Sequence, residues 1–544
     1  MSIGHRIKQS LSNWGRIQEI LRIFAKYGFA NLIREMGLSS DQSGDEATHA
    51  KSMPWQLRKA FEELGPTFIK LGQIMSTRPD LLPPEYIAEF SKLRDDVPPF
   101  SFIEVETIIE EEFGRSLGEI YESFETTPIA AASVSQVHRA KLQEPEAGLL
   151  EVVVKVQRPH ITEKIQADIQ ILYFLARTLK KVRKDFRLFN LTGIVREFQK
   201  SISEELDFGL EAKNIEEIGR NSQENEVVVF PQVVWSSSSK RVLTMSELKG
   251  QVLSQVKEYP VSIDRPYLAD SLAEFFLESI FFHGHFHCDA HPGNLILIEE
   301  GRGKIGLVDF GMVGRLSPDL RDKMSRIFLA LVSQDFTSLA SLYTEVATFN
   351  RRFSLKEFRL DLERLLEPNL NKPLSQVDVG AMMLDSIQIA RKYEVKLPRD
   401  LILFYRAVVT LEFLGRSIDP EFTFLKFGTR FSKKLIQRKL STENVMRDLF
   451  RFVEGLRSLS TDIPSQLKII LNRLETDGGL DRYSEGIQAF KRTNKILALS
   501  IILFGLIIGA SIISSFQPQH FAVLPLWIAA GFSFLLLLTQ IFRK

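Results

Sequence analysis

The chain has little cysteine and no excess of charge of either sign. Cys288 is the one cysteine in 544 residues, so no intramolecular disulfide can form and a disulfide-stapled secreted class is excluded. Lys and Arg number 69 against 68 Asp and Glu, so no global positive field attracts nucleic acid. The first 35 residues hold no continuous apolar run, and we expect no secretory signal peptide. A reducing compartment therefore fits the bulk of the chain.

Length and composition predict a folded protein with several packed parts. A chain of 544 residues is long enough for about two or three domains. Its 44% hydrophobic and 25% charged residues are near the globular average, which argues against extended disorder, collagen or coiled coil. The 41 Phe residues are many for this length and, with an apolar carboxyl end, they indicate membrane contact.

Two uncharged runs near the carboxyl end predict a transmembrane helical hairpin. Residues 496–516 and 521–542 each exceed the roughly 20 residues that a helix needs to cross hydrocarbon. Lys and Arg flank the outer ends of both runs, and residues 517–520 between them contain neither, so the body of the chain is expected in the cytoplasm. The alternative is a buried helical hairpin in a soluble core.

The amino end and the segment before the hairpin are both basic and helical in pattern. Residues 1–38 predict amphipathic helices, whose apolar face could meet a bilayer or the main domain. Residues 39–53, rich in Ser, Asp, Glu and Gly, predict a linker. Residues 426–490 predict basic juxtamembrane helices, which could meet anionic headgroups or only solvent.

The middle of the chain carries polar residues in the order of a protein kinase. Lys155 lies in the strand-forming run 151–156, where a charge is costly without an anion or a carboxylate. A lysine that points to solvent from an edge strand is the simpler alternative. Asp289 and Asn294 have the spacing of a kinase catalytic loop, and an Asp-Phe-Gly sequence begins at Asp309 after a predicted hairpin. The three elements together predict a two-lobe kinase-like fold.

These residue types suit magnesium and ATP. Asp309 and the amide oxygen of Asn294 are hard ligands for Mg²⁺. Lys155 can neutralise charge on the α- and β-phosphates. Asp289 is placed to accept a hydroxyl proton or to orient water. The segment that contains Glu247 and Leu248 would join the two lobes and offer backbone groups to adenine.

A cluster of histidines allows a second interpretation, a zinc or iron centre. Its members are His283, His285, His287 and His291, beside Cys288 and Asp289. Such residue types bind transition metals. That interpretation leaves Lys155, Asn294 and Asp309 unexplained, and a lone cysteine is most often a small buried hydrophobe.

Three further motifs lie outside this kinase order, and the first of them is absent from ordinary kinases. The first is a KxGQ sequence formed by Lys70, Leu71, Gly72 and Gln73, the second is an alanine-rich run of Ala130, Ala131, Ala132 and Ser133, and the third is an ExD sequence with Glu205 and Asp207. With the catalytic loop, these residues resemble the UbiB family of atypical protein-kinase-like proteins, also called the Abc/ADCK group. The resemblance spans about residues 55–420 and extends to a carboxyl-terminal membrane anchor.

The resemblance implies a nucleotide site that is closed by a lid. Ala130 to Ser133 would form the nucleotide loop, with less backbone freedom than glycines allow, although alone this run also reads as a helix start. In the family, Glu211 would pair with Lys155, and Glu205 with Lys70. On a helix, Asp207 and Glu211 would share one face and Glu205 would lie on another. The regulatory lid would then comprise Lys70, Gly72, Gln73, Glu205 and Asp207. A solvated acidic helix face is the alternative.

The resemblance also implies an activity and a place. We expect an atypical kinase or ATPase that uses Mg²⁺ and ATP to support ubiquinone (isoprenoid quinone) biosynthesis, at the bacterial inner membrane with its catalytic domain in the cytoplasm. Its expected partners are membrane lipids, isoprenoid quinone precursors and other quinone-biosynthesis proteins, and not nucleic acid. A nucleotide-switched pseudokinase scaffold and an ordinary protein kinase are the alternatives.

The predicted fold class is α+β, a two-lobe protein-kinase-like fold with an N-terminal helical extension and a C-terminal transmembrane helical hairpin. The predicted parts between the linker and the basic helices are the KxGQ helical extension over 54–125, the kinase-like N-lobe with a helical insertion over 126–250, and the kinase-like C-lobe over 251–425.

Overall fold

The computed structural model of the chain describes most residues up to 439 and a few near the carboxyl end. The described residues are 3–37, 52–76, 78, 81–93, 97–146, 149–182, 191–288, 290–346, 354–370, 377–393, 395, 397–439, 503, 507, 525 and 527–534. The chain divides into two compact units, Met1–Gln437 and Arg438–Lys544. The predicted linker 39–53 lies outside the described residues except for its last two positions.

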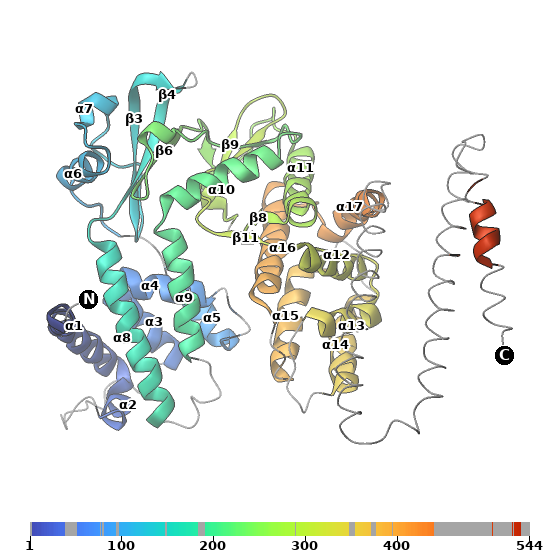
Figure 1. Cartoon of the computed structure of the whole chain (residues 1–544), viewed down its shortest axis with the longest axis horizontal. Helices are drawn as coiled ribbons and strands as arrows, with labels where there is room; N and C mark the ends of the chain where they lie inside the picture. Colours follow the sequence, from blue (N-terminus) through green and yellow to red (C-terminus); the bar gives the residue numbers. More distant parts are fainter. Residues whose placement is uncertain are drawn as a thin grey trace. The chain divides into compact units, whose positions relative to one another are not determined.

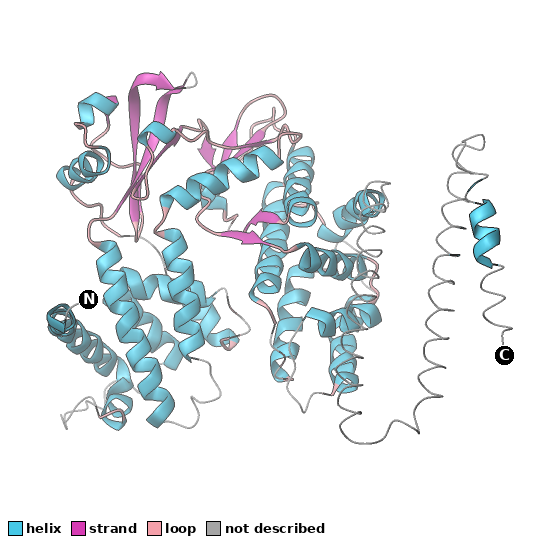
Figure 2. Cartoon of the chain, viewed as in Figure 1, coloured by secondary structure: helices cyan, strands magenta, loops and turns pink. Residues whose placement is uncertain are grey.

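A five-stranded antiparallel sheet forms the first lobe (Figure 2). Its strands follow the order β1-β3-β4-β6, with β2 paired to β3. The strands are β1 (Tyr121–Phe124), β2 (Ala130–Ala131), β3 (Ser135–Glu146), β4 (Leu149–Gln157) and β6 (Val242–Ser246). Two helices, α6 (Phe102–Phe113) and α7 (Leu117–Ile120), precede the sheet, and each begins with a Ser-x-x-Glu capping box. The sheet therefore begins before residue 126, where we placed the start of the lobe.

Strand β4 divides its side chains between two faces, because side chains alternate along a strand. Val152, Val154 and Val156 are fully buried in an apolar cluster that α6 and β6 also line. Val153 and Lys155 lie on the opposite face, where Val153 joins the main apolar cluster. Lys155 therefore points toward the side of the sheet that holds α10 (Phe208–Asn221) and away from open solvent.

Helices from two distant stretches of the chain build one helical domain, which we call the helical cap (Figure 1). Its helices are α1 (Ile3–Phe24), α2 (Ala30–Glu35), α3 (Met53–Leu64), α4 (Pro66–Ser76), α5 (Pro84–Phe90), α8 (Ile161–Val182) and α9 (Leu191–Glu205). Residues of α1, α3, α4, α5, α8 and α9 share a single apolar cluster. Since α8 and α9 follow β4 in the chain, the insertion in the first lobe and the amino-terminal extension share one core.

The helical pattern predicted for the extension is confirmed. Phe61, Leu64, Phe68 and Leu71, which recur at helical spacing, are buried. Helix α4 begins at Pro66, directly after Gly65, whose φ of 91° lies in the region that favours glycine. Proline suits the first turn of a helix, where its missing N–H is not needed.

Helix α1 packs against the protein over its carboxyl-terminal half. Ile20 and Ile23 are buried in the cap cluster. Arg16 donates from Nε to Asp168 Oδ1 at 2.8 Å and from Nη2 to the Leu64 carbonyl at 2.9 Å. Because Asp168 on α8 is fully buried, this ion pair fixes α1 to the cap, and here the apolar face of the helix meets the main domain.

The second lobe is mainly helical and holds the largest apolar cluster. Its helices are α11 (Arg265–Glu278), α12 (Pro318–Val332), α13 (Phe336–Val346), α14 (Leu355–Leu370), α15 (Val379–Lys392), α16 (Arg399–Ile418) and α17 (Phe424–Lys439). A small sheet in the order β5-β10-β9-β7 and a two-stranded sheet lie at its start. These strands are β5 (Val228–Val229), β7 (Gln251–Val252), β8 (His285–His287), β9 (Leu295–Ile298), β10 (Lys304–Leu307) and β11 (Val313–Arg315).

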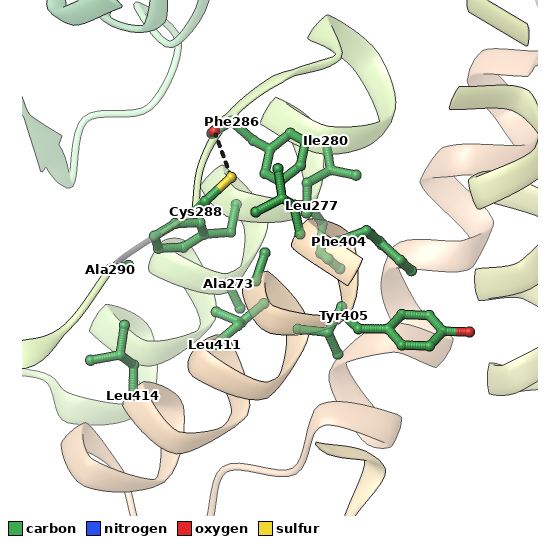
Figure 3. Packing of buried hydrophobic residues seen from close by; sticks show 14 of the residues in the cluster. Ala273, Leu277, Ile280, Phe286, Cys288, Ala290, Phe404, Tyr405, Leu411 and Leu414 are labelled. Atoms are coloured by element: carbon green, nitrogen blue, oxygen red, sulfur yellow. Dashed lines mark hydrogen bonds between the residues drawn. The ribbon is translucent and has the colours of Figure 1, made fainter. Parts of the chain in front are cut away.

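Cys288 lies in the core of this lobe (Figure 3). It is fully buried, beside Phe286 and near Leu277 of α11 and Leu411 of α16. Its thiol donates a weak hydrogen bond to the Phe286 carbonyl at 3.7 Å. The prediction that Cys288 is a small buried hydrophobe is confirmed, and it fixes the chain just before the predicted catalytic loop.

The second unit contains the described helical residues 503, 507, 525 and 527–534. Over the residues that the structure describes, no helix has the length and apolar character to cross a bilayer. Most of the two predicted spans, 496–516 and 521–542, lies outside those residues, as does the predicted basic segment beyond 439. The transmembrane hairpin therefore stays a prediction.

Candidate nucleotide site

An ion pair between Lys155 and Glu211 joins the sheet to α10. Lys155 Nζ lies 2.8 Å from Glu211 Oε1 and 2.9 Å from Oε2. Their side chains are 15% and 3% exposed. Burial alone would lower the pKa of Lys155, but the carboxylates of Glu211 and Asp309 more than offset it, and the pKa of the lysine is raised. Lys155 is therefore charged, and the pairing that the family resemblance implies is present.

Asp309 lies beside this ion pair and keeps part of its side chain exposed. Its Oδ1 is 3.9 Å from Lys155 Nζ and accepts the Gly311 N–H at 2.9 Å, while 45% of its side chain is exposed. Burial would raise the pKa of this carboxyl, but Lys155, the Gly311 N–H, His287 and Lys70 lower it overall. Asp309 is therefore an ionised carboxylate among cations, available to a further positive ligand.

The backbone around Asp309 is held from three sides. The Phe310 N–H donates to Glu211 Oε1 at 3.4 Å, and Asn214 Nδ2 donates to the Phe310 carbonyl at 3.2 Å. The ring Nε2 of His287 makes a hydrogen bond with the Asp309 carbonyl. Phe310 itself is fully buried. Helix α10 thus positions both Lys155, through Glu211, and the Asp-Phe-Gly segment, through Asn214.

Asn294 lies beside Asp309 because of the β9–β10 hairpin. Leu295 pairs with Leu307, and the Val308 N–H donates to the Asn294 carbonyl at 3.2 Å. The two predicted magnesium ligands therefore leave neighbouring strands at the same end of the hairpin. The predicted hairpin between them is confirmed.

Lys70 brings the helical cap to this site. Its Nζ lies 2.7 Å from Glu205 Oε1, at side-chain exposures of 15% and 22%. A methyl group added at Gly311 would lie 4.0 Å from Glu205 Cγ, so this lid pair is next to the Asp-Phe-Gly segment. The second pairing that the resemblance implies is also present.

The other residues of the KxGQ motif support the lid by packing. A Cβ at Gly72 would lie 2.2 Å from Leu93 Cδ1 and 3.0 Å from Phe61 Cδ2, so any larger residue would have to displace Leu93. Gln73 Nε2 donates to the Leu93 carbonyl at 3.3 Å. Of this motif, Lys70 carries the charge toward the site, and Gly72 and Gln73 hold α4 against the chain that follows α5.

The ExD motif differs from the prediction. Helix α9 ends at Glu205 and α10 begins at Phe208. Glu205 and Glu211 therefore lie on two different helices and not on two faces of one helix. Asp207 is the N-cap of α10, and its Oδ1 accepts the Leu210 N–H at 3.2 Å. The prediction of one continuous helix was wrong because aspartate is a preferred N-cap residue and a new helix starts there.

The alanine-rich run forms a hairpin and not a helix start. Ala130 pairs with Val137 and Ala131 with Gln136, and the Ala132 N–H donates to the Ser135 carbonyl at 2.8 Å. Ser133 is fully buried, and within the described structure its hydroxyl has no hydrogen-bond partner.

The predicted hinge residues connect the two sheets. Strand β6 ends at Ser246, and Glu247 Oε1 then accepts a hydrogen bond from Arg139 Nε at 2.7 Å. Leu248 packs over Gly306 of β10, where a Cβ would lie 2.7 Å from Leu248 Cδ1. The side chain of Glu247 is therefore used within the first lobe, as is its N–H, which donates to the Glu151 carbonyl at 3.4 Å.

Asp289, the predicted catalytic base, lies outside the described residues. No set of three or more His, Cys, Asp and Glu side chains that could hold a metal occurs among the residues the structure describes. His287 instead binds the Asp309 backbone. Our sequence analysis missed the roles of His287 and Asn214, although Asn214 lies three residues after Glu211 and so shares its helix face.

Two family models match parts of this chain. Residues 92–343 match the ABC1 atypical kinase-like domain, and residues 362–423 match the UbiB helical domain. A "Probable protein kinase UbiB" of Pseudomonas fluorescens (strain SBW25) is 32% identical over 408 residues, which are 74% of this chain and 76% of that protein. The chain belongs to the UbiB family.

Membership of the UbiB family confirms the α+β kinase-like fold predicted from the motifs. The ABC1 match covers the first lobe and extends into α13, and the UbiB helical match covers α15 and α16. Among solved structures, the Rv3197-erythromycin complex from Mycobacterium tuberculosis has a TM-score of 0.46 and 23% identity, over 64% of this chain and 87% of that chain.

Proposed function

We propose that this UbiB-family protein is a membrane-anchored atypical kinase or ATPase that uses Mg-ATP to support ubiquinone biosynthesis. In this proposal ATP hydrolysis is coupled to the handling of isoprenoid lipid precursors at the membrane surface. The observation that carries it is the convergence of three separate stretches of chain, in which Lys155 Nζ lies within 4 Å of carboxylate oxygens of both Glu211 and Asp309.

The residues present fit magnesium and a triphosphate. Asp309 is an ionised, partly exposed carboxylate, and Asn294 leaves the neighbouring strand beside it. These two would hold Mg²⁺, Lys155 would bind phosphate oxygens, and the buried Ser133 hydroxyl has a hydrogen bond to give. When bound, the metal supplies charge neutralisation on the phosphates. The chain's own residues fix the positions at which this happens.

The lid favours ATP hydrolysis or a small acceptor over a protein substrate. Lys70 and Glu205 lie against Gly311, next to where an acceptor group would approach the terminal phosphate. A bulky polypeptide would have to displace this contact, whereas water or the polar head of a prenyl lipid would not. The relative's name, protein kinase UbiB, supports phosphoryl transfer from the same site.

Binding and turnover of ATP by the purified full chain test the proposal. Asp309→Asn removes the charge that would hold magnesium, so the rise in melting temperature with Mg-ATP and the release of phosphate should both disappear. Asp322→Asn, on the exposed side of α12, is the matched control and should behave as wild type. An Asp309→Asn variant that keeps its affinity for Mg-ATP would contradict the site.

A quinone profile tests the cellular role. After deletion of the gene, we expect ubiquinone to fall and its precursors to accumulate, with rescue by wild type and none by Asp309→Asn. Binding without turnover, together with rescue by a variant that binds ATP but does not hydrolyse it, would favour a nucleotide-switched scaffold. Unchanged quinones after deletion would exclude both forms of the proposal.

A further inference from the structure

The tip of the alanine-rich hairpin is buried in the helical cap. Val134, at the turn, is 4% exposed and belongs to the same apolar cluster as residues of α1, α3, α4, α8 and α9. Its neighbours Ser133 and Ser135 are also buried. A loop that covers a nucleotide from one lobe would ordinarily have a free tip, because loops run over the surface. Here the tip is part of another domain's core.

Arg158 ties the same hairpin to the chain that follows the cap's α5. Its Nη2 donates to the Ala132 carbonyl at 3.2 Å and to the Pro98 carbonyl at 3.0 Å, and its guanidinium lies 5.2 Å from the centre of the Phe100 ring. The Arg158 N–H also donates to the Val134 carbonyl at 2.8 Å. Arg158 therefore contacts the hairpin twice, at Ala132 and Val134, and the segment 97–100 twice, at Pro98 and Phe100.

The guanidinium of Arg158 is committed to main-chain carbonyls. Burial lowers the pKa of Arg158, and the charge of Glu104 offsets this only in part. Within the described chain, its Nε is buried without a hydrogen-bond partner. A partly desolvated arginine that bridges two carbonyls fixes their spacing, since its planar fork has few ways to satisfy both.

Gln136 makes the second connection, on the other strand of the hairpin. Its Oε1 accepts the Phe100 N–H at 3.0 Å and its Nε2 donates to the Phe100 carbonyl at 3.3 Å. Gln136 is 1% exposed and lies opposite Ala131 in the β2–β3 register. Both polar groups of one backbone residue are thus held by one side chain, which ties residues 97–100 to the hairpin.

We propose that Arg158 and Gln136 are positioning residues that fix the alanine-rich hairpin to residues 97–100 and so keep its tip, Val134, seated in the helical cap, so that nucleotide can enter or leave only when the cap moves. This proposal rests on the nucleotide site proposed above. It assigns the slow step of nucleotide exchange to the clamp, whereas affinity comes from Lys155, Asn294 and Asp309. The lid ion pair of Lys70 and Glu205 is a separate contact, next to the Asp-Phe-Gly segment.

Release of a fluorescent ATP analogue measures the clamp directly. Full-length protein is loaded with N-methylanthraniloyl-ATP and Mg²⁺, and release is followed after mixing with excess ATP. We expect Arg158→Ala and Gln136→Ala each to release the analogue about tenfold faster than wild type, the effect of losing hydrogen bonds to a buried group. Arg158→Lys, which keeps the charge without the fork, should lie between.

Arg241→Ala is the matched control. Arg241 also makes its side-chain contacts on the first lobe, with Glu111 and Glu112 of α6, and does not touch the hairpin. Its release rate should equal that of wild type. Equal acceleration in Arg241→Ala would mean that general loosening of the lobe causes the effect, and it would overturn the clamp.

The outcomes separate this proposal from the proposed function. If wild type fails to bind the analogue, the nucleotide site itself is wrong. If wild type binds it and both clamp variants release it at the wild-type rate, the nucleotide site stands and the clamp is wrong. Hydrogen exchange of residues 128–138 gives a second readout, slow in wild type and faster in both variants. Should Arg158→Ala fail to fold, Gln136→Ala decides.

Discussion

Two lysine–glutamate pairs at the candidate nucleotide site are alike in length and differ in their surroundings. The inner pair, Lys155 and Glu211, is nearly buried and bidentate, and Glu211 also receives the Phe310 N–H. The lid pair, Lys70 and Glu205, is as short but more exposed. Because the inner pair is buried, either partner alone would be an uncompensated charge, so the folded state requires both. The lid pair is the more exposed of the two, so its loss should cost less.

Removal of Glu211 should have the largest effect. Glu211→Ala leaves Lys155 buried without the carboxylate that contributes most to raising its pKa. We expect the free energy of unfolding to fall by about 3–5 kcal/mol, together with loss of Mg-ATP binding. Urea denaturation measures the first and thermal shift the second. Glu122→Ala, exposed on β1, is the control. A loss below about 1 kcal/mol in Glu211→Ala would mean that the pair contributes no more to stability than an exposed surface ion pair.

Acid should first lower the free energy of unfolding through His285, which lies near Glu217 in the carboxyl-terminal half of α10. His285 is 4% exposed, and burial and the charge of Arg315 lower its pKa to about 4, with a smaller opposing contribution from Glu217. The unfolded chain, with a histidine pKa near 6.5, therefore binds more protons than the folded protein between these values. Stability should fall by about 2 kcal/mol between pH 7 and pH 5.

The same experiment with His285→Gln identifies the source of this loss. Glutamine cannot be protonated, so the variant should lose much less stability between pH 7 and pH 5 in urea denaturation. The lowered pKa of Asp309 adds a further loss, but only as pH falls below the usual range of a carboxyl. An unchanged slope in His285→Gln would mean that other groups set the acid sensitivity.

Gly72→Ala should strain the helix that carries the lid lysine. The new Cβ would lie 2.2 Å from Leu93 Cδ1, and such overpacking costs about 1–3 kcal/mol. Gly118→Ala, where a Cβ meets nothing within 4 Å, is the matched control and should be neutral or slightly stabilising. Thermal denaturation compares the two variants, and equal melting temperatures would show that Leu93 moves aside freely.

The charged residues of the site could be predicted from the sequence because kinase chemistry fixes their types and order. Lys155, Asn294 and Asp309 stand at motif spacings, and the structure places Asn294 and Asp309 at one end of a hairpin. Both lysine pairings came from the family resemblance and could not be derived from spacing, because Lys70 and Glu205 are far apart in the chain.

Features that depend on long-range packing could not be predicted from the sequence. The break between α9 and α10 turns on a single N-cap residue, Asp207, in a stretch whose acidic spacing also fits one helix. The helical cap combines α4 with α8, and no local pattern shows that such distant helices share a core. The burial of Val134 in that core is of the same kind. Apolar periodicity indicates that a face is covered, but not which element covers it.

The lid pair should give the smallest effect and the sharpest contrast with the inner pair. In a double-mutant cycle of Lys70→Ala and Glu205→Ala, we expect a coupling energy of about 1 kcal/mol, because both side chains keep some contact with solvent. Mg-ATP binding should persist in all three variants, since neither residue belongs to the Lys155, Asn294 and Asp309 set. The equivalent cycle for Lys155 and Glu211 should give a clearly larger coupling. Equal coupling energies in the two cycles would mean that burial does not separate the pairs, and that the lid is as fixed as the fold.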